Sequence, residues 1–381
     1  MSATKVNVAV VGLGFGESFL PIYRDHPDVG ELGIVEPEAA RRDQVGDRHG
    51  ITHRYADLET VLTESDWDAV HLLSPVRFHA EHTVAVLESG KHCACAVPMA
   101  TDLADIDAIL AAQRRAGTNY TMMETSRYTR EYLTARQLYD DGELGEINLY
   151  KGFHLQNLDG YPTYWQGFPP MQYVTHALSP MLDLIGGPVT TVRAVGSGRL
   201  SQARRTGGFD NRFPTEVALF ELQNATAIAE VTVSFSQLSR GYVEGFNVYG
   251  DRMGLEWPAR VGGPLQGFRL RAERAGQRGR RVDAFDVTTD DHAERLPAPL
   301  RRYTRAHRFE PADGSPPTTV HAGHGGSHPH LVDDFIASIV TGRPSAIPAT
   351  TAANFTAPGI VAHASAMSGG EALPVPAYGA A

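Results

Sequence analysis

Short apolar runs alternate with helical stretches along the first 125 residues, and this alternation restricts the fold more than any other feature of the chain. The first run, residues 6–11, reads Val-Asn-Val-Ala-Val-Val. Strands buried on both faces have this β-branched composition, because helices cover both sides of a parallel sheet. Similar runs stand at 33–36, 68–73, 93–97 and 119–123, and helices are expected between them at 37–48, 78–89 and 102–116. We therefore predict an α/β fold with a doubly wound parallel sheet of the Rossmann type.

The pattern changes after residue 145, where longer alternating runs replace the short buried ones. Strands are expected at 146–154, 189–196, 215–222, 226–236 and 243–250, and helices at 174–185, 331–340 and 349–368. Such alternation is typical of a large, mostly antiparallel open sheet with a packed helix, which predicts a second domain of the α+β kind. We place the two domains at 1–125 and 126–381, with the last helices able to pack back on the first.

The composition argues against several classes of protein. Acidic residues outnumber basic ones by 44 to 34, a net charge of −10, whereas nucleic-acid binders more often carry a basic excess. The start of the chain lacks the features of a signal peptide, and no run of about 18 apolar residues occurs, so no membrane span is expected. Cys93 and Cys95 are poorly spaced for a disulfide, and we predict a cytoplasmic protein in which both thiols pack in the core.

Lysine is scarce: only Lys5, Lys91 and Lys151 occur among the 34 basic residues. Arginine keeps its proton at working pH, whereas lysine can be tuned into a general base. Lys5 should begin the first strand and Lys91 precedes a later strand at its far end, so only Lys151 could reach a cleft between the domains. Any mechanism that uses a lysine therefore has only these three candidates.

Residues 258–320 contain twelve arginines, many glycines and prolines, and little periodicity. A solvated surface excursion or long loop is the simpler interpretation, and an oligomer arm or an anion-binding flap is the alternative.

A glycine turn follows the first strand, with glycines at Gly12, Gly14 and Gly16 around Phe15. Glycines at such a place let the backbone approach a pyrophosphate, which rests on the N-terminus of the next helix. The third glycine stands one place earlier than in the usual G-x-G-x-x-G fingerprint. Glu36 ends the second strand, where a carboxylate accepts hydrogen bonds from ribose hydroxyls and repels a 2′-phosphate. NAD is thus favoured over NADP, although Arg41 and Arg42 nearby soften that preference.

Together with this turn, three further segments make the sequence resemble the glucose–fructose oxidoreductase/inositol dehydrogenase (Gfo/Idh/MocA) family over nearly its whole length. They are Ser74-Pro75-Val-Arg-Phe-His79, Leu87-Glu-Ser-Gly-Lys-His92 and Gly142-Glu-Leu-Gly-Glu-Ile147. The resemblance implies a nicotinamide held between a Rossmann domain and a domain for substrate binding and oligomerisation. It also implies hydride transfer on a sugar or cyclitol carbinol, in a homodimer or homotetramer. The expected cofactor contacts are Gly12, Gly14, Phe15, Gly16, Glu36, Ser74, Pro75, His79 and Pro98.

Two family features are replaced. The family usually carries Glu-Lys-Pro after its fifth strand, with the lysine acting on the reacting hydroxyl, and this chain has Ala96-Val97-Pro98. The family also tends to carry an aspartate four residues before a histidine, and this chain has Gln172 before His176.

One branch of the family is more similar. NAD-dependent glycosidases carry Glu-Val-Pro at the same place, and they resemble this chain in Met122-Met-Glu-Thr-Ser-Arg-Tyr128 and in Tyr173-Val-Thr-His176-Ala-Leu-Ser-Pro180. A tyrosine of that branch falls near Phe153, which departs from its pattern. The branch implies a redox-neutral route of oxidation at C3, elimination, hydration and reduction, outside the paired-carboxylate mechanisms.

Acid–base work then falls to histidine and tyrosine. His176 is the first candidate, because its unperturbed pKa is closest to working pH. Tyr128, at the carboxyl edge of the first sheet, is the second. The expected substrate contacts are His154, Gln156, Gln172, Tyr173, Tyr164, Trp165 and His328. The histidines of the loop 321–330 lack a matched set of carboxylates or thiols, so no metal site is predicted.

The sequence therefore predicts an NAD-dependent enzyme acting on a sugar pyranoside, with glycoside cleavage slightly favoured. A plain sugar or cyclitol dehydrogenase and a non-catalytic sugar- or NAD-binding subunit remain as alternatives. Arginines such as Arg127 and Arg240 allow an anionic sugar.

Overall fold

The computed structural model describes residues 5–223, 225–260, 262–276 and 278–379. The chain forms two compact units, and each combines segments that are distant in sequence. The first consists of Met1–Thr129 and Asp291–Ala353, and the second of Arg130–Asp290 and Asn354–Ala381. From the sequence, residues 1–125 were expected to bind NAD and residues 126–381 to bind substrate. This assignment of the two ligands stays a prediction. The contacts place 291–353 with the first unit.

A six-stranded parallel sheet forms the centre of the first unit. Its order is β3-β2-β1-β4-β5-β6, the order of a doubly wound dinucleotide-binding sheet, which confirms the predicted fold class. The strands are β1 (Val6–Val11), β2 (Val29–Val35), β3 (His53–Tyr55), β4 (Ala69–Leu72), β5 (His92–Cys95) and β6 (Tyr120–Met122). The sequence did not predict β3, because three residues are too few to show a period.

Short helices connect these strands, and the helix α6 (Leu103–Ala116) ends where the sequence indicated. Asp102 caps the start of α6 by accepting a hydrogen bond from the Ala104 N–H (2.8 Å), and Gly117 ends the helix in the left-handed conformation (φ 69°). The helices are α1 (Leu13–Gly16), α2 (Leu20–Asp25), α3 (Ala39–His49), α4 (Leu58–Thr63), α5 (His79–Glu88) and α6 (Leu103–Ala116). Shorter 3₁₀ turns are η1 (Glu17–Phe19), η2 (Val76–Phe78) and η3 (Thr125–Arg127).

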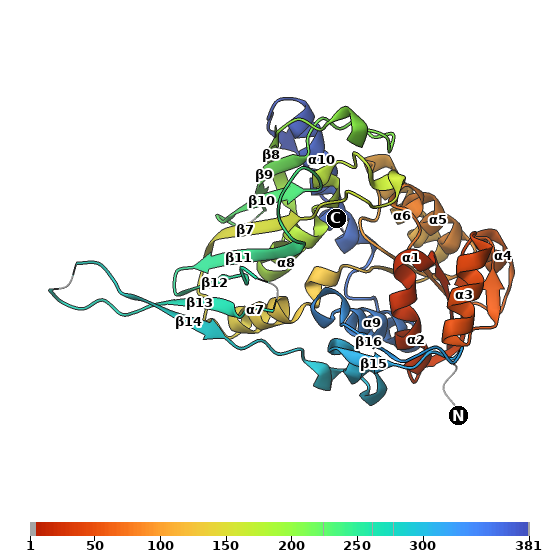
Figure 1. Cartoon of the computed structure of the whole chain (residues 1–381). Helices are drawn as coiled ribbons and strands as arrows, with labels where there is room; N and C mark the ends of the chain where they lie inside the picture. Colours follow the sequence, from red (N-terminus) through yellow and green to blue (C-terminus); the bar gives the residue numbers. More distant parts are fainter. Residues whose placement is uncertain (1–4, 224, 261, 277, 380–381) are drawn as a thin grey trace. The chain divides into compact units, whose positions relative to one another are not determined.

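The segment 291–353 completes the first unit. It contains η7 (Ala293–Arg295), η8 (Ala298–Thr304), the hairpin of β15 (His307–Phe309) with β16 (Thr318–Val320), η9 (Gly323–Gly326) and α9 (His328–Thr341). The helix α9 lies beside α2 (Figure 1), and its Phe335 and Ile336 are fully buried in one core with Val8 of β1. The helix at 331–340 is therefore part of the Rossmann unit.

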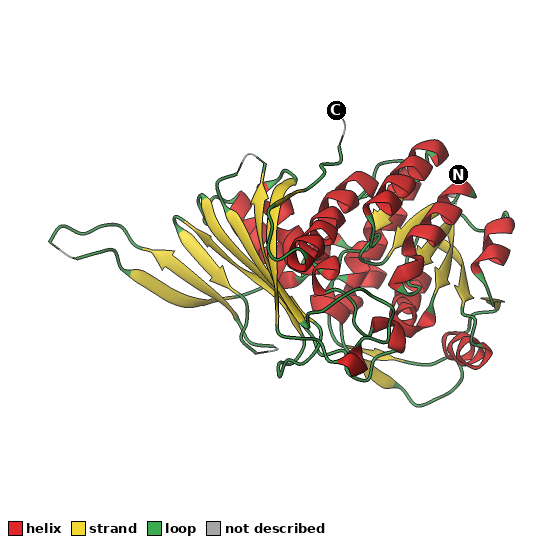
Figure 2. Cartoon of the chain, turned by 90° about the horizontal axis from the view of Figure 1, so that it is seen from above, coloured by secondary structure: helices red, strands yellow, loops and turns green. Residues whose placement is uncertain are grey.

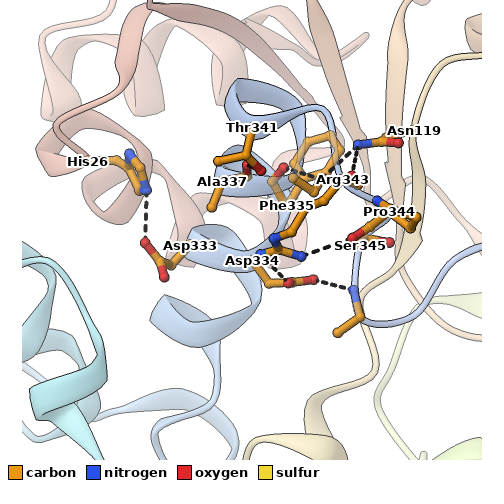
Figure 3. Close-up of polar contacts among 12 residues, drawn as sticks. His26, Asn119, Asp333, Asp334, Phe335, Ala337, Thr341, Arg343, Pro344 and Ser345 are labelled. Atoms are coloured by element: carbon orange, nitrogen blue, oxygen red, sulfur yellow. Dashed lines mark hydrogen bonds and ion pairs between the residues drawn. The ribbon is translucent and has the colours of Figure 1, made fainter.

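Polar contacts hold α9 and the turn after it in place (Figure 3). His26 lies 3.3 Å from Asp333, and Arg343 pairs with Asp334 at 2.9 Å. The side chain of Asn119, just before β6, donates to the hydroxyl of Ser338 and to the carbonyl of Arg343. These contacts join a late segment of the chain to the far edge of the parallel sheet.

A nine-stranded sheet forms the second unit, in the order β14-β13-β12-β11-β7-β10-β9-β8-β17. Among the strands that the structure describes, only β7 and β10 pair in parallel, so the sheet is mostly antiparallel, as predicted. Its strands are β7 (Ile147–Leu155), β8 (Val189–Ser197), β9 (Thr215–Leu222), β10 (Ile228–Ser234), β11 (Val243–Gly250), β12 (Met253–Glu256), β13 (Leu265–Leu270), β14 (Val282–Val287) and β17 (Leu373–Pro374).

The helix α8 (Thr175–Ile185) packs across β7, β10 and β11. Tyr150 on β7 donates its hydroxyl to the carbonyl of Ala177 (2.7 Å), and a Cβ at Gly152 would lie 2.1 Å from the same oxygen. The close crossing thus requires a glycine on the strand. Also present are α7 (Arg130–Asp140), α10 (Ala349–Met367, within which the division between the units falls), η4 (Thr163–Trp165), η5 (Pro170–Tyr173) and η6 (Gln202–Arg204).

The arginine-rich segment is only partly a surface excursion. Its first part forms the hairpin of β13 and β14, which extends beyond the rest of the sheet (Figures 1 and 2). Arg269 in β13 faces Asp283 in β14 across the pair, so charges interrupt the apolar alternation by which a strand is recognised. In the described part of the chain, no helix is long and apolar enough to cross a membrane.

Candidate functional site

The glycine turn after β1 has the backbone that dinucleotide binding requires. Gly12 has φ 87°, and a Cβ there would lie 2.6 Å from the carbonyl oxygen of Leu73. A Cβ at Gly16 would approach Val10 and Leu73 to 3.1 and 3.2 Å, so the early third glycine still lets the helix pack closely on the sheet. At Gly14 the nearest atom would be 3.5 Å away, on Arg41, which leaves room beside the backbone. These residues fit a pyrophosphate at the N-terminus of α1.

Glu36 faces this turn from the end of β2. Its two carboxylate oxygens accept hydrogen bonds from the N–H groups of Leu13 (3.1 Å) and Glu38 (3.2 Å). The neighbouring arginines are engaged elsewhere, since Arg42 donates to the carbonyl of Glu36 (2.8 Å) and Arg41 lies 3.6 Å from the Glu38 carboxylate. The carboxylate is therefore held where it can meet a ribose, and this fits NAD.

His79 is buried and joins the ends of two strands. Its Nδ1 lies 2.8 Å from the carbonyl oxygen of Pro98, and its Nε2 lies 2.8 Å from that of Ser74. Both partners only accept, so the ring must donate from both nitrogens and carry a positive charge. Burial lowers the pKa of His79, but Cys95 and the two carbonyls outweigh burial and raise it to about 9. His79 thus holds Ser74, Pro75 and Pro98 in place and presents little surface of its own.

The histidine-rich loop packs on the glycine turn. Phe15 is 43% exposed, and its ring makes edge contacts with His324 (5.7 Å between centroids) and His328 (5.5 Å). His328 is buried and stacks on Phe19 at 4.3 Å. His324 adopts φ 42° at the tip of the loop. The structure therefore places His328, a predicted substrate contact, against the cofactor turn of the first unit.

Tyr128 also belongs to the first unit. Its ring stacks parallel to His330 at 5.9 Å, and His330 Nε2 lies 2.9 Å from the carbonyl oxygen of Asp291. The second predicted proton carrier thus has an aromatic neighbour from α9.

In the second unit, three predicted site residues form a cluster of rings. His176, near the start of α8, lies 5.5 Å from His154 on β7 and 5.2 Å from Tyr173 in η5, between ring centroids. His154 Nε2 lies 3.3 Å from Gln156 Oε1, and the Gln156 amide donates to the hydroxyl of Tyr161 (3.0 Å).

Aromatic side chains form a wall next to this cluster. Trp165 contacts Tyr173 at 5.5 Å and Tyr164 at 5.9 Å between ring centroids. Gln172 is half-buried in the same turn as Tyr173. The predicted substrate contacts of this unit therefore gather beside one histidine-containing cluster.

Glu244 on β11 is a site residue that the sequence analysis missed. Its carboxylate lies 3.7 Å from His176 Nε2, and both side chains are buried. The strand at 243–250 was predicted, and Glu244 shares its buried face with Phe246 and Val248. A charged residue at the end of an apolar strand face was the signal that could have identified it.

None of the three lysines joins this cluster. Lys151 lies 3.1 Å from Glu230, and Lys91 donates to the carbonyls of Glu64 (2.7 Å) and Trp67 (3.0 Å). Lys5 precedes β1, as expected.

Comparison with known proteins agrees with this geometry. Residues 6–124 match the family model for the NAD-binding Rossmann fold of the GFO/IDH/MocA oxidoreductases, and residues 132–256 match the model for the GFO/IDH/MocA C-terminal domain. The chain belongs to the Gfo/Idh/MocA family. The resemblance predicted from the sequence is confirmed, as is NAD as the cofactor.

Three relatives of this Gfo/Idh/MocA protein have names that denote different reactions. A 4-carboxy-2-hydroxymuconate-6-semialdehyde dehydrogenase of Sphingobium sp. is 26% identical over 45% of this chain and 57% of its own length. An inositol 2-dehydrogenase of Saccharopolyspora erythraea is 27% identical over 60% and 66%. A glycosyl hydrolase family 109 protein of Streptomyces coelicolor is 26% identical over 50% and 46%. The matches thus span between 46% and 66% of these relatives.

Among solved structures, levoglucosan dehydrogenase in complex with NADH and levoglucosan superposes with a TM-score of 0.77. The identity is 19%, and the match covers 98% of this chain and 100% of that one. This similarity supports the fold assignment.

Proposed function

We propose that the protein is an NAD-dependent, hydride-transferring enzyme acting on a sugar pyranoside, and that its net reaction is redox-neutral cleavage of the glycoside. The observation that carries this proposal is the buried cluster of His176 and His154, in a chain that has Val97 at the family's lysine position. Valine cannot exchange a proton, so the acid–base groups must come from elsewhere in the chain.

The residues divide the work as follows. The glycine turn and Glu36 hold the dinucleotide, and bound NAD supplies a hydride acceptor that can return the hydride. His176 takes the proton of the reacting hydroxyl, since imidazole exchanges protons near neutral pH. Tyr128 stays the predicted second proton carrier, and the aromatic wall of Tyr164, Trp165 and Tyr173 offers apolar surface to a sugar face.

Net oxidation of a sugar or cyclitol is the second candidate. It is favoured by the inositol dehydrogenase relative and by the levoglucosan dehydrogenase neighbour, whereas the family 109 relative favours cleavage. A non-catalytic binding subunit is the third candidate, because Val97 and Gln172 replace two polar groups that the family usually carries.

One experiment separates the three. The purified protein with NAD is incubated in deuterated water with nitrophenyl pyranosides of both anomeric configurations, including neutral, N-acetylated and uronate sugars. Release of nitrophenol without matching NADH, and with deuterium at C2 of the sugar, is the expected result. Stoichiometric NADH without cleavage would support the dehydrogenase instead. If no sugar of the panel gives nitrophenol, NADH or deuterium exchange at C2, both enzymatic functions are contradicted.

A further inference from the structure

We infer that Glu244 is a positioning residue for His176, orienting the imidazole and stabilising the charge that it gains when it takes the substrate proton. This inference rests on the proposed function. It assigns a role to a carboxylate that is not among the site residues predicted from the sequence.

The sheet and α8 bring the pair together. β11 runs antiparallel to β7, and Glu244 stands directly opposite His154 in the register of the two strands. α8 crosses β7 and β11, and it carries His176 to 3.7 Å from the Glu244 carboxylate. The three side chains come from three elements and are 7%, 1% and 4% exposed for Glu244, His154 and His176.

Burial makes the pairing energetically significant. A carboxylate in an apolar environment is costly unless a cation or hydrogen-bond donors compensate, and Glu244 follows the same strand face as Phe246 and Val248. The closest cation on the next strand is Lys151, an odd number of residues from His154, so it points to the opposite face and pairs with Glu230 at 3.1 Å. The imidazole of His176, 3.7 Å away, is a basic group placed to compensate this carboxylate.

Other titratable groups surround the pair. His154 faces it from β7, Tyr173 from η5, and Tyr242, just before β11, contacts the His154 ring at 5.7 Å. η5 precedes α8 and offers the neutral amide of Gln172 and the phenol of Tyr173. Among these groups Glu244 supplies the carboxylate.

The chemistry follows from that arrangement. Nε2 of His176 faces the Glu244 carboxylate. In the proposed reaction the proton of the sugar hydroxyl moves to Nδ1 of the ring as the hydride leaves the same carbon for NAD, and the carboxylate stays ionised. A buried carboxylate at this ion-pair distance stabilises the imidazolium that forms, as in other carboxylate–histidine pairs.

The test compares Glu244→Gln with Glu244→Asp and with Glu230→Gln, a matched neutralisation on the neighbouring strand β10, where the carboxylate is partly exposed. Thermal unfolding and NAD binding are measured first, to show that each variant folds and loads cofactor. The ring signals of His176 are then followed by NMR against pH without substrate. We expect Glu244→Gln alone to move the titration of His176 to lower pH.

Activity is measured with the nitrophenyl pyranoside that the wild-type protein cleaves fastest. Glu244→Gln should lower kcat by about 100-fold or more with little change in KM, and Glu244→Asp should recover part of the loss. An unchanged His176 titration, or a kcat equal to that of Glu230→Gln, would overturn the inference. If the wild type cleaves no pyranoside, the proposed function fails, and the NMR comparison still decides whether Glu244 acts on His176.

Discussion

His363 on α10 and Glu216 on β9 form a buried hydrogen-bonded pair, 2.7 Å from Nδ1 to Oε1. The other ring nitrogen lies 3.1 Å from the carbonyl oxygen of Asp210, so the ring faces two acceptors and must donate from both nitrogens. The second carboxylate oxygen of Glu216 accepts from the N–H of Met171 (2.8 Å). The pair thus ties α10 to the turn that carries Gln172 and Tyr173.

This pair predicts a loss of stability as pH rises above the ordinary pKa of histidine, about 6.5. Burial lowers the pKa of His363, but Glu216 outweighs burial and raises it. The stabilisation is therefore fully present below the unfolded-state pKa of about 6.5 and is lost as pH rises through the higher folded-state value. His363→Asn should remove this dependence. Urea unfolding at several pH values, followed by the fluorescence of Trp165 and Trp257 in the second unit, provides the measurement.

Glu216→Gln gives a complementary check on the same pair. Removing the charge leaves a buried imidazolium without its partner, which costs about 3 kcal/mol or more. A variant as stable as the wild type at pH 7 would show that the ring is not charged.

For His71 on β4 we predict the opposite pH dependence to that of His363: folding stability falls as pH falls. The ring is fully buried, with Nδ1 at 3.1 Å from the hydroxyl of Tyr23, and burial lowers the pKa of His71 to about 3. Below pH 6.5 the unfolded chain takes up a proton that the folded chain refuses, so stability falls as pH drops from about 6.5 toward 3. The slope is about 1.4 kcal/mol for each pH unit.

The measurement is denaturant unfolding of the first unit between pH 7 and pH 4, followed by hydrogen exchange of the β1 and β4 amides. His71→Phe should flatten this slope, whereas His53→Gln, at a side chain that is 45% exposed, should leave it unchanged. An equal slope in the His71→Phe variant would assign the acid sensitivity to other groups.

The parts of the fold that were predictable from sequence depend on neighbours close in the chain. The strand, the turn at Gly12 and the carboxylate of Glu36 follow one another within 31 residues, and each has a local signature. The position of α9 has no such signature, because an apolar helix face does not by itself specify which core it packs against. Its place was decided by packing against α2 and β1.

The site shows the same limit. His176, His154 and Tyr173 were recognisable as residue types in suitable segments, and the structure brings their rings together. Glu244 could not be assigned to them, because its distance from His176 depends on the register of β11 against β7 and on how α8 crosses both. Neither the register nor the crossing can be predicted from a single segment of the sequence.

Gly12→Ala is expected to damage both stability and cofactor binding. The backbone there has φ 87°, and the new Cβ would lie 2.6 Å from the Leu73 carbonyl oxygen, so the turn must shift. We expect a loss of about 1–3 kcal/mol in unfolding free energy and NAD binding at least about tenfold weaker. Thermal unfolding and titration with NAD measure the two effects.

Gly14→Ala is the matched control for that variant. Its φ is ordinary, it lies within α1, and its Cβ would meet only Arg41 at 3.5 Å, so stability should change by less than about 0.5 kcal/mol. Weaker NAD binding with unchanged stability would show that the backbone of Gly14 approaches the cofactor. Equal loss of stability in both variants would contradict the distinction between a strained turn and an open cradle.

Glu36 should set the preference for NAD over NADP. Its carboxylate is held by the N–H groups of Leu13 and Glu38, and a 2′-phosphate placed there would meet a fixed negative charge. Glu36→Gln removes that repulsion and one acceptor of ribose hydroxyls, so affinity for NAD should fall and affinity for NADP should rise. We expect the ratio of the two dissociation constants to change by about tenfold, since one lost charged hydrogen bond corresponds to roughly 1.5 kcal/mol.

The control is Glu38→Gln, because the Glu38 carboxylate is 60% exposed and pairs with Arg41. The ratio of dissociation constants in this variant should stay near that of the wild type. Binding titrations with both dinucleotides decide the matter, and an unchanged ratio in Glu36→Gln would mean that Arg41 and Arg42, rather than the carboxylate, govern the choice.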